Sequence, residues 1–241
     1  MKGDIDLEGI RVNRFLSEAG VSSRRGSDKM VEDGRVTIDG IVAVLGDKVF
    51  LGSEVCVDGR PVTREMEIVI IAFNKPIGIT STADPDDKNN VIDFIGYPKR
   101  IYSIGRLDKD SEGLLLMTND GDLANNIMKS RNEHDKEYIV TVDKDITPAF
   151  IKGMANGVPI LDGRITKRCV VESVGPRMFK IILRQGLNRQ IRRMCEHFDY
   201  NVVNLKRVRV MNIELGNLKE GRYRDITRSE RDELYALLKL K

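Results

Sequence analysis

The polar segment at residues 60–66 most constrains the fold, because it separates two stretches with different residue patterns. It reads RPVTREM, and its proline and charged side chains are typical of a linker. The 241 residues suffice for one sizeable domain and one small domain. We therefore predict two domains, at residues 1–62 and 67–241.

The first stretch, residues 10–59, has the pattern of two short helices followed by short strands. Its first apolar residues recur at helical spacing: they are Val12, Phe15, Leu16 and Ala19. Gly20 ends this helix, and Ser22 or Ser23 can cap a second helix that Gly34 ends.

A hairpin and a group of basic residues complete the first stretch. The dipeptide Asp39-Gly40 lies between short apolar segments and favours a tight turn. Five basic residues lie along the two helices and can share one exposed surface: Arg11, Arg14, Arg24, Arg25 and Lys29. This pattern resembles the S4 RNA-binding domain, and the resemblance implies that these five residues bind RNA. A basic surface without an RNA role is the alternative, because residues 1–66 carry 10 basic and 12 acidic residues.

The second stretch alternates predicted strands and helices, which is typical of an α+β fold with a mostly antiparallel or mixed sheet. Strands are expected near residues 67–74, 100–105, 114–118, 136–143, 165–174, 178–184 and 202–215. Helices are expected after Asp120, from Thr147-Pro148, near residues 189–198, and after the capping box of Thr227 and Glu230.

Composition excludes several classes of site. Two histidines and three separated cysteines offer little to a Ser-His-Asp hydrolase, a zinc centre or a redox pair. We therefore expect no metal and no cofactor, and chemistry that depends on carboxylates, Tyr, Lys or Arg. No apolar run reaches the roughly 18 residues of a membrane span, and the first residues lack the apolar core of a signal peptide, so we expect a cytoplasmic protein.

Positive charge gathers in one part of the second stretch. The net charge of +3 does not by itself indicate a nucleic-acid partner. Residues 184–209, however, carry seven Lys or Arg against two acidic residues. This segment is a candidate phosphate-binding footprint.

Three short motifs carry the candidate chemistry. Residues 105–114 read GRLDKDSEGL, residues 136–138 read KEY, and residues 186–194 read GLNRQIRRM. In this order and at these separations they resemble the pseudouridine synthase superfamily, in its S4-domain branch that modifies bacterial ribosomal RNA, the RsuA family. Residues 134–138 and 187–189 resemble the F type of large-subunit synthase. Leu187 and Arg189 stand where many members have Arg and His, so we expect substrate contacts to differ rather than the chemistry.

The resemblance implies a pseudouridine synthase catalytic domain behind a small S4-like RNA-binding domain. The reaction breaks the N1–C1′ bond of a uridine in structured RNA and rejoins the uracil through C5, without a metal or cofactor. The expected substrate is 23S rRNA near the peptidyl-transferase region, with 16S rRNA or a tRNA anticodon loop as alternatives. We expect a monomer with no obligate protein partner.

The resemblance and the residue types assign the site. Asp108 is the expected catalytic carboxylate, either as a nucleophile at C1′ or C6 or as a base for the 2′ proton. A carboxylate removed from water needs a cation to stay charged, and we expect Arg192 to supply it. Tyr138 is expected to stack on the extruded uracil and to transfer a proton. Five further residues are expected to bind the substrate: Arg106, Lys136, Leu183, Arg189 and Arg193.

Two rival functions are open at this point. A non-catalytic RNA-binding or ribosome-assembly factor with a silenced second domain would have lost Asp108, which is present. A glycosidase or nucleosidase would use Asp108 and Asp110 as an acid/base pair and would release free uracil.

Overall fold

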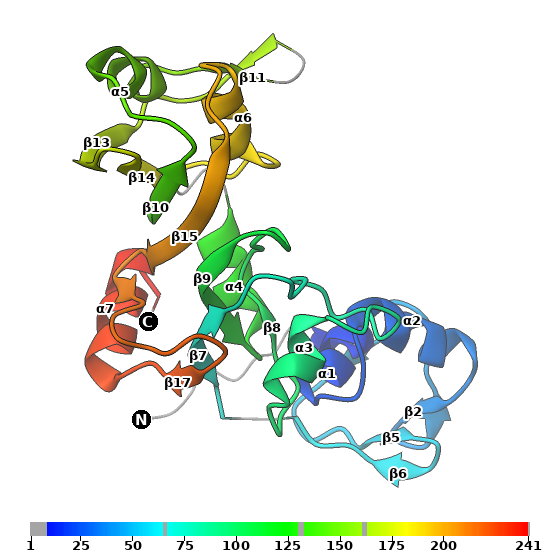
Figure 1. The fold of residues 1–241 in the computed structure, drawn as a ribbon. Coiled ribbons are helices and arrows are strands. Elements are labelled where there is room, and N and C mark those ends of the chain that lie inside the picture. Colours follow the sequence, from blue (N-terminus) through cyan, green and yellow to red (C-terminus); the bar gives the residue numbers. More distant parts are fainter. Residues whose placement is uncertain (1–8, 65–66, 130–132, 161–162, 241) are drawn as a thin grey trace. The chain divides into compact units, whose positions relative to one another are not determined.

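The computed structural model describes residues 9–64, 67–129, 133–160 and 163–240 (Figure 1). The chain forms two compact units, which comprise residues 1–68 and 69–241. The described residues contain no helix that is both long enough and apolar enough to span a membrane.

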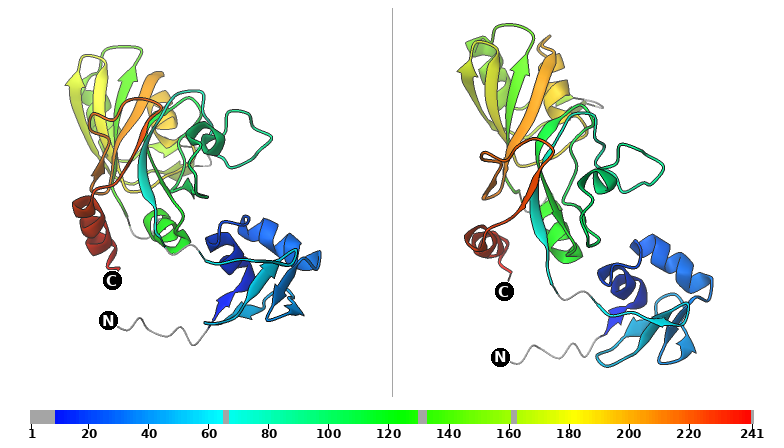
Figure 2. Two further views of the ribbon diagram at one scale, coloured as in Figure 1. Left: turned by 90° about the horizontal axis from the view of Figure 1, so that it is seen from below. Right: turned by 60° about the horizontal axis from the view of Figure 1, so that its bottom comes forward.

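The N-terminal unit consists of two helices and short strands. Its helices are α1 (Val12–Glu18) and α2 (Arg24–Glu32). Its strands are β1 (Ile10–Arg11), β2 (Val36–Ile38), β3 (Ile41–Val42), β4 (Lys48–Val49), β5 (Val55–Val57) and β6 (Arg60–Pro61). Four of the strands form a sheet in the order β3-β2-β5-β6, and β1 pairs with β4. Figure 2 shows α1 and α2 together on one side of the strands, and the two helices bury Val12, Leu16 and Val31.

The local signals of this unit are confirmed. The Ser23 hydroxyl caps α2 by accepting a hydrogen bond of 3.0 Å from the Gly26 amide. Asp39 and Gly40 both have positive φ, at 51° and 80°, and join β2 to β3 as a hairpin. The linker was predicted to begin at Arg60, and this is wrong, because Arg60–Pro61 forms β6 at the edge of the sheet, where proline is tolerated. Residues 65 and 66 of that linker lie outside the described residues.

The C-terminal unit is built on one mixed sheet, as predicted. Its strand order is β13-β14-β10-β15-β9-β7-β17, with β16 beside β15 and β8 beside β9. The strands are β7 (Ile70–Lys75), β8 (Tyr102–Ser103), β9 (Glu112–Thr118), β10 (Lys136–Val142), β13 (Val170–Gly175), β14 (Met178–Leu183), β15 (Val202–Val210), β16 (Ile213–Glu214) and β17 (Tyr223–Asp225). Among these described strands, β15 and β9 form the parallel pair and the other pairs are antiparallel.

Five described helices cover the sheet (Figures 1 and 2). They are α3 (Val91–Ile95), α4 (Gly121–Met128), α5 (Pro148–Ala155), α6 (Gln190–Glu196) and α7 (Arg228–Leu238). Asp120 caps α4, Thr147 caps α5, and the capping box of Thr227 and Glu230 begins α7, all as predicted. The helix α3 was not predicted.

Two predicted strands differ from the structure. The segment expected to be a strand at residues 165–174 is divided, because β12 (Arg164–Ile165) pairs with β11 (Pro159–Ile160), and β13 begins only at Val170. The strand expected at residues 100–105 is reduced to β8, and the chain then leaves the sheet. That departure produces the loop that carries Asp108.

Alternation along the strands divides the core into layers. On β9, Leu114 and Leu116 face α4 and α7, whereas Leu115 and Met117 face α3. A third cluster joins β10 and β14 to α5 and α6. The sheet is thus held from both sides next to the point where β10, β15 and β9 meet.

Gly113 marks the closest approach of β9 to β15. It pairs with Arg207 and has φ of 103°. A Cβ atom at this position would lie 2.3 Å from the Arg207 carbonyl oxygen and 2.8 Å from its amide nitrogen. Glycine is therefore required here because the two backbones are in contact. This contact explains why the motif at residues 105–114 has glycine at position 113.

Candidate active site

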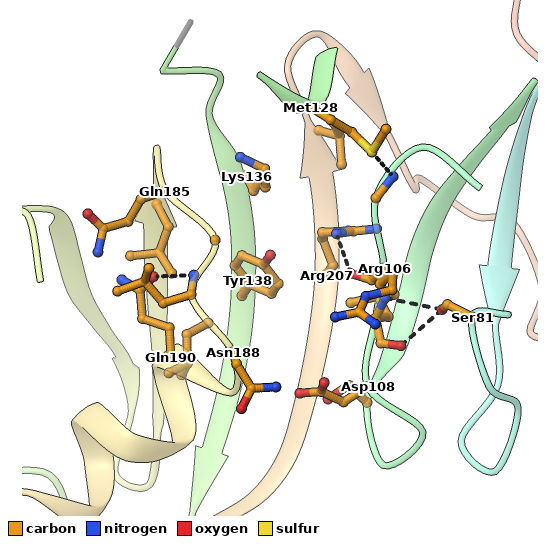
Figure 3. A pocket seen from close by; sticks show the side chains of 18 of the residues that line it. Ser81, Arg106, Asp108, Met128, Lys136, Tyr138, Gln185, Asn188, Gln190 and Arg207 are labelled. Atoms are coloured by element: carbon orange, nitrogen blue, oxygen red, sulfur yellow. Dashed lines mark hydrogen bonds between the residues drawn. The ribbon is translucent and has the colours of Figure 1, made fainter. Parts of the chain in front are cut away.

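A cavity of about 540 Å³ opens in the C-terminal unit between the loop before β9, the strands β10 and β15, and the loop before α6 (Figure 3). Seven basic residues line it: Arg106, Lys129, Lys136, Arg184, Arg189, Arg192 and Arg207. Asp108 is the acidic residue among the described lining residues. A carboxylate surrounded by cations and apolar groups suits a polyanionic substrate that must meet one reactive acid.

The backbone on either side of Asp108 is fixed by hydrogen bonds. The Ser81 hydroxyl donates to the Leu107 carbonyl at 2.9 Å and accepts from the Leu107 amide at 3.1 Å, as the dashed lines in Figure 3 show. The Gly78 amide donates to the Lys109 carbonyl at 2.8 Å. Residues 78–81 therefore hold the loop in place, and Asp108 is presented from a rigid support.

Lys75 holds the segment that carries Ser81. Its side chain is 0% exposed, and its Nζ donates to the carbonyls of Pro76 and Ile79, both at 2.8 Å. Burial lowers the pKa of Lys75 to about 8, although the charges of Asp110 and Asp108 oppose this. No pattern in the sequence indicates this role of Lys75.

Arg207 connects β15 to both ends of the Asp108 loop. It is 3% exposed, and its guanidinium donates to the carbonyls of Leu114 at 2.6 Å and Arg106 at 3.5 Å. Arg207 was predicted to belong to the phosphate-binding footprint at residues 184–209. Because its side chain is buried, the number of basic residues available to phosphates in that segment is smaller than predicted. Arg209 in the same strand is likewise paired, with Glu137, at 3.0 and 2.8 Å.

The predicted pairing of Arg192 with Asp108 is wrong. Arg192 is 8% exposed and lies against Asp110: its Nη2 donates to the Asp110 carbonyl at 2.8 Å, and its Nε lies 3.3 Å from the Asp110 carboxylate. Arg189 approaches Asp108 instead, with 3.9 Å between Arg189 Nη1 and Asp108 Oδ2. The reason is that α6 turns Arg192 inward, toward the Val202 carbonyl, whereas Arg189 precedes the helix with φ of 50°.

Asp110 organises the two arginines. Burial alone would raise the pKa of Asp110, but the hydrogen bonds from Arg189 and the charge of Arg192 outweigh burial, so that this pKa lies below its ordinary value. The same bidentate contact, at 3.2 and 3.0 Å, raises the pKa of Arg189. Asp110 thus holds Arg189 beside Asp108. The Asp108 side chain is 40% exposed, so the expected dry carboxylate is not found in the open cavity.

Tyr138, Leu183 and Lys136 line the cavity from two neighbouring strands. Lys136 on β10 pairs with Leu183 on β14, and Tyr138 lies two residues farther along β10. Figure 3 places the Tyr138 ring in the middle of the site, between the two loops. Burial, assisted by the charge of Arg207, lowers the pKa of Lys136, whose Nζ donates to the His134 carbonyl at 3.0 Å. The Tyr138 ring, Leu183 and the half-buried Lys136 are thus available to a base.

Of the two remaining residues expected to bind the substrate, Arg106 lines the cavity and Arg193 does not. Arg106 is exposed and lines the cavity near Asp108 (Figure 3). Arg193 lies outside the lining residues, and its Nη2 donates to the Asn188 Oδ1 at 2.7 Å. Arg193 thus contacts Asn188, which lines the cavity, and its predicted contact with the substrate stays a prediction.

The basic residues of the N-terminal unit remain available to a partner, with one exception. Arg11, Arg24, Arg25 and Lys29 are exposed. Arg14 is half-buried and pairs at 2.7 Å with Glu18, which also pairs with Arg64 at 2.6 Å. Arg14 is thus the least free of the five to meet a phosphate.

The described residues contain no group of three or more histidine, cysteine, aspartate or glutamate side chains that could hold a metal ion. The cavity instead offers one carboxylate, several guanidinium groups and one phenol, which can act on a substrate by proton transfer, covalent addition and charge compensation.

Comparison with known proteins connects this geometry to a family. The RNA pseudouridylate synthase family model matches residues 69–197, and the S4 domain model matches residues 10–55. The chain is 50% identical over 231 residues to the dual-specificity RNA pseudouridine synthase RluF of Escherichia coli K12, covering 95% of this chain and 79% of that protein. It is 34% identical over 236 residues to the ribosomal large subunit pseudouridine synthase B of Bacillus subtilis, covering 94% and 96%.

A solved structure agrees with the sequence relatives. A crystal structure described as a pseudouridylate synthase superposes with a TM-score of 0.69 at 26% identity, and covers 93% of this chain and 99% of that chain. The matching family model spans more than half of the 241 residues and contains all of Asp108, Tyr138 and Arg192. The chain therefore belongs to the RNA pseudouridine synthases, in the RsuA branch with an N-terminal S4 domain, and is similar to RluF.

Proposed function

We propose that this chain converts a uridine of 23S rRNA near the peptidyl-transferase region to pseudouridine, with Asp108 as the reacting carboxylate. The observation that carries the proposal is the position of Asp108, the acidic residue among the described lining residues of a cavity rich in arginine. The choice of 23S rRNA is supported by the relative of the chain that is named as a large-subunit synthase.

The cavity suits an extruded nucleotide. A base inside a duplex cannot meet a carboxylate that lines a cavity, so it must leave its stack, which costs a few kcal/mol and less in loops and bulges. The Tyr138 ring and Leu183 offer apolar surface to the uracil. Arg106 lies at an exposed position of the lining, where it can neutralise a phosphate of the same strand.

The chemistry needs one bond broken, one bond formed and one proton moved. The C1′–N1 bond breaks, the uracil turns, and C5 bonds to C1′. The proton on C5 leaves, and N1 takes up a proton in place of its bond to C1′. Asp108 acts either by adding to C1′ or C6 or by removing the 2′ proton. In each case Arg189, 3.9 Å away, offsets the charge of its carboxylate, and the Tyr138 hydroxyl lies in the cavity as a group that can carry a proton.

Tritium release tests the proposal. Purified protein is given 23S rRNA tritiated at uracil C5, and we expect tritium to appear in water without free uracil, because the base is rejoined to its ribose. The 16S rRNA, tritiated in the same way, is expected to release none. Release of free uracil would indicate a nucleosidase, and release from 16S rRNA alone would move the substrate to the small subunit.

A second substrate class has one specific observation in its favour. The relatives that are 50% identical to the chain are named dual-specificity synthases. We therefore propose a tRNA anticodon loop as a second substrate. The same assay with C5-tritiated tRNA is expected to release tritium, and its failure would restrict the enzyme to ribosomal RNA.

The N-terminal unit is proposed to anchor the RNA through α2. Replacing Arg24 and Arg25 together by glutamate should weaken RNA binding about tenfold or more and lower the slope of log affinity against log salt by about 1–2, because two phosphate contacts are lost. Turnover at saturating RNA should change little, since the cavity is untouched. Filter binding at several salt concentrations measures both quantities.

The control carries the same charge change elsewhere. Lys219→Glu with Arg228→Glu alters two exposed residues that line neither the cavity nor α2. Equal weakening by the two double variants would show that total charge, and not the surface of α2, determines RNA binding.

A further inference from the structure

Asn188 extends into the cavity with its amide oriented by a charged neighbour. Arg193 Nη2 lies 2.7 Å from the Asn188 side chain. A guanidinium can donate hydrogen bonds but cannot accept them, so the atom that it meets must be the amide oxygen. The Nδ2 group is thereby left to face the cavity, and Figure 3 shows it directed toward the carboxylate of Asp108.

The loop around Asn188 is fixed on both sides. Gln190 is buried, and its side-chain Oε1 accepts a hydrogen bond of 3.1 Å from the Leu187 backbone amide. The Gln190 backbone amide donates to the Leu187 carbonyl at 3.2 Å. Arg189 is tied to Asp110 across the cavity. Asn188 therefore projects from a rigid turn, and its position is set before any substrate arrives.

The amide nitrogen is an unused donor. Within the described parts of the chain, no acceptor takes a hydrogen bond from Asn188 Nδ2. It points toward Asp108, and both side chains line the same cavity, so that both can meet one substrate. An amide offers two N–H donors, whereas an ionised carboxylate offers acceptors alone. Asn188 and Asp108 can therefore hold one substrate group between them. That group accepts a hydrogen bond from Asn188, and Asp108 takes a proton from it or forms a bond to it.

We propose that Asn188 contacts the substrate and donates a hydrogen bond to the 2′ oxygen of the target ribose, with Arg193 as its positioning residue. The proposal rests on the proposed function. Each role open to Asp108 places it beside the C1′–N1 bond, because it reacts at C1′, at the 2′ carbon next to C1′, or at C6 next to N1. A donor that faces Asp108 therefore meets the same sugar. The 2′ hydroxyl is the acceptor on the carbon next to C1′, and it is the group that distinguishes RNA from DNA.

Three variants separate this role from a merely structural one. Asn188→Ala should lower kcat/KM about tenfold, the value expected for one lost hydrogen bond. Asn188→Asp keeps the oxygen that Arg193 binds but removes both donors, and should lose at least as much. If Asn188 only braced the loop, Asn188→Asp would instead retain wild-type activity, because its contact with Arg193 would persist. Arg193→Met should lose activity too, and adding it to Asn188→Ala should cause no further loss.

Binding to a modified RNA tests the contact itself. The Asp108→Asn protein, which should bind without turnover, is compared with the same protein carrying Asn188→Ala. The probes are two copies of a 23S rRNA hairpin containing the mapped target, one with uridine and one with 2′-deoxyuridine at that position. Asp108→Asn should prefer the uridine hairpin about tenfold, and the added Asn188→Ala should reduce the preference to about twofold or less.

The outcomes are distinguishable from failure of the proposed function. If the wild-type protein releases no tritium from 23S rRNA, both the proposed function and this inference fail. If wild-type protein is active but Asn188→Asp matches it, or the preference for uridine is the same with and without Asn188→Ala, only the role of Asn188 is overturned. Thermal unfolding of each variant, expected to match the wild-type protein, excludes loss of folding as the cause.

Discussion

Replacing Asp108 by asparagine is expected to lower tritium release from 23S rRNA at least about a thousandfold, within the range found for removal of a catalytic acid or base. Asparagine has nearly the same size, and the loop is held by backbone contacts of Leu107 and Lys109 that do not involve the side chain. RNA affinity should therefore change by no more than a few-fold. Tritium release and filter binding measure the two effects separately.

Asp110→Asn is the matched control for this prediction. It removes a neighbouring carboxylate that lines no part of the cavity but holds Arg189 and Arg192. We expect a smaller loss, about tenfold to a hundredfold, because Arg189 would no longer be held beside Asp108. If Asp110→Asn abolished release while Asp108→Asn retained it, the assignment of the reacting carboxylate would be wrong.

Gly113→Ala is expected to destabilise the protein by about 2–5 kcal/mol. Positive φ costs an L-residue about 1–2 kcal/mol, and forcing β9 away from β15 adds about 1–3 kcal/mol of repacking. The clash is with the backbone of Arg207, so no side chain can turn aside to relieve it. Urea unfolding followed by circular dichroism measures the change in the free energy of unfolding.

Gly105→Ala separates the two contributions. Gly105 also has positive φ, at 77°, but a Cβ atom there would meet nothing within 4 Å. Its replacement should therefore cost only the backbone contribution of about 1–2 kcal/mol. Equal destabilisation by the two variants would show that the close approach of β9 and β15 contributes nothing to stability.

Local signals predicted much of the fold because they act over a few residues. The caps at Ser23, Asp120 and Thr147 bond to amides two or three positions away, and the hairpin at Asp39-Gly40 depends on two backbone conformations. The motif residues at 105–114 likewise form one continuous segment, a loop that leads into β9. These features can be inferred from spacing and residue type alone.

Contacts between distant segments could not be inferred in this way. Arg192 lies 82 positions from Asp110 in the sequence, and whether it meets Asp108 or Asp110 depends on how α6 packs beside β15. Arg207 was counted as a surface charge because its strand alternates in a way that does not reveal burial at the meeting of β9 and β15. The role of Lys75 depends on the return of the chain at Ile79. The contacts of Arg192, Arg207 and Lys75 are all decided by strand register and by the packing of distant segments.

The most direct test of the central claim is a map of pseudouridines in ribosomal RNA from cells that lack this protein. The map is repeated after the wild-type chain, or its Asp108→Asn variant, is supplied to those cells. We predict that a pseudouridine in 23S rRNA near the peptidyl-transferase region is lost, that the wild-type chain restores it, and that Asp108→Asn does not. An unchanged map, or restoration by Asp108→Asn, would contradict the account.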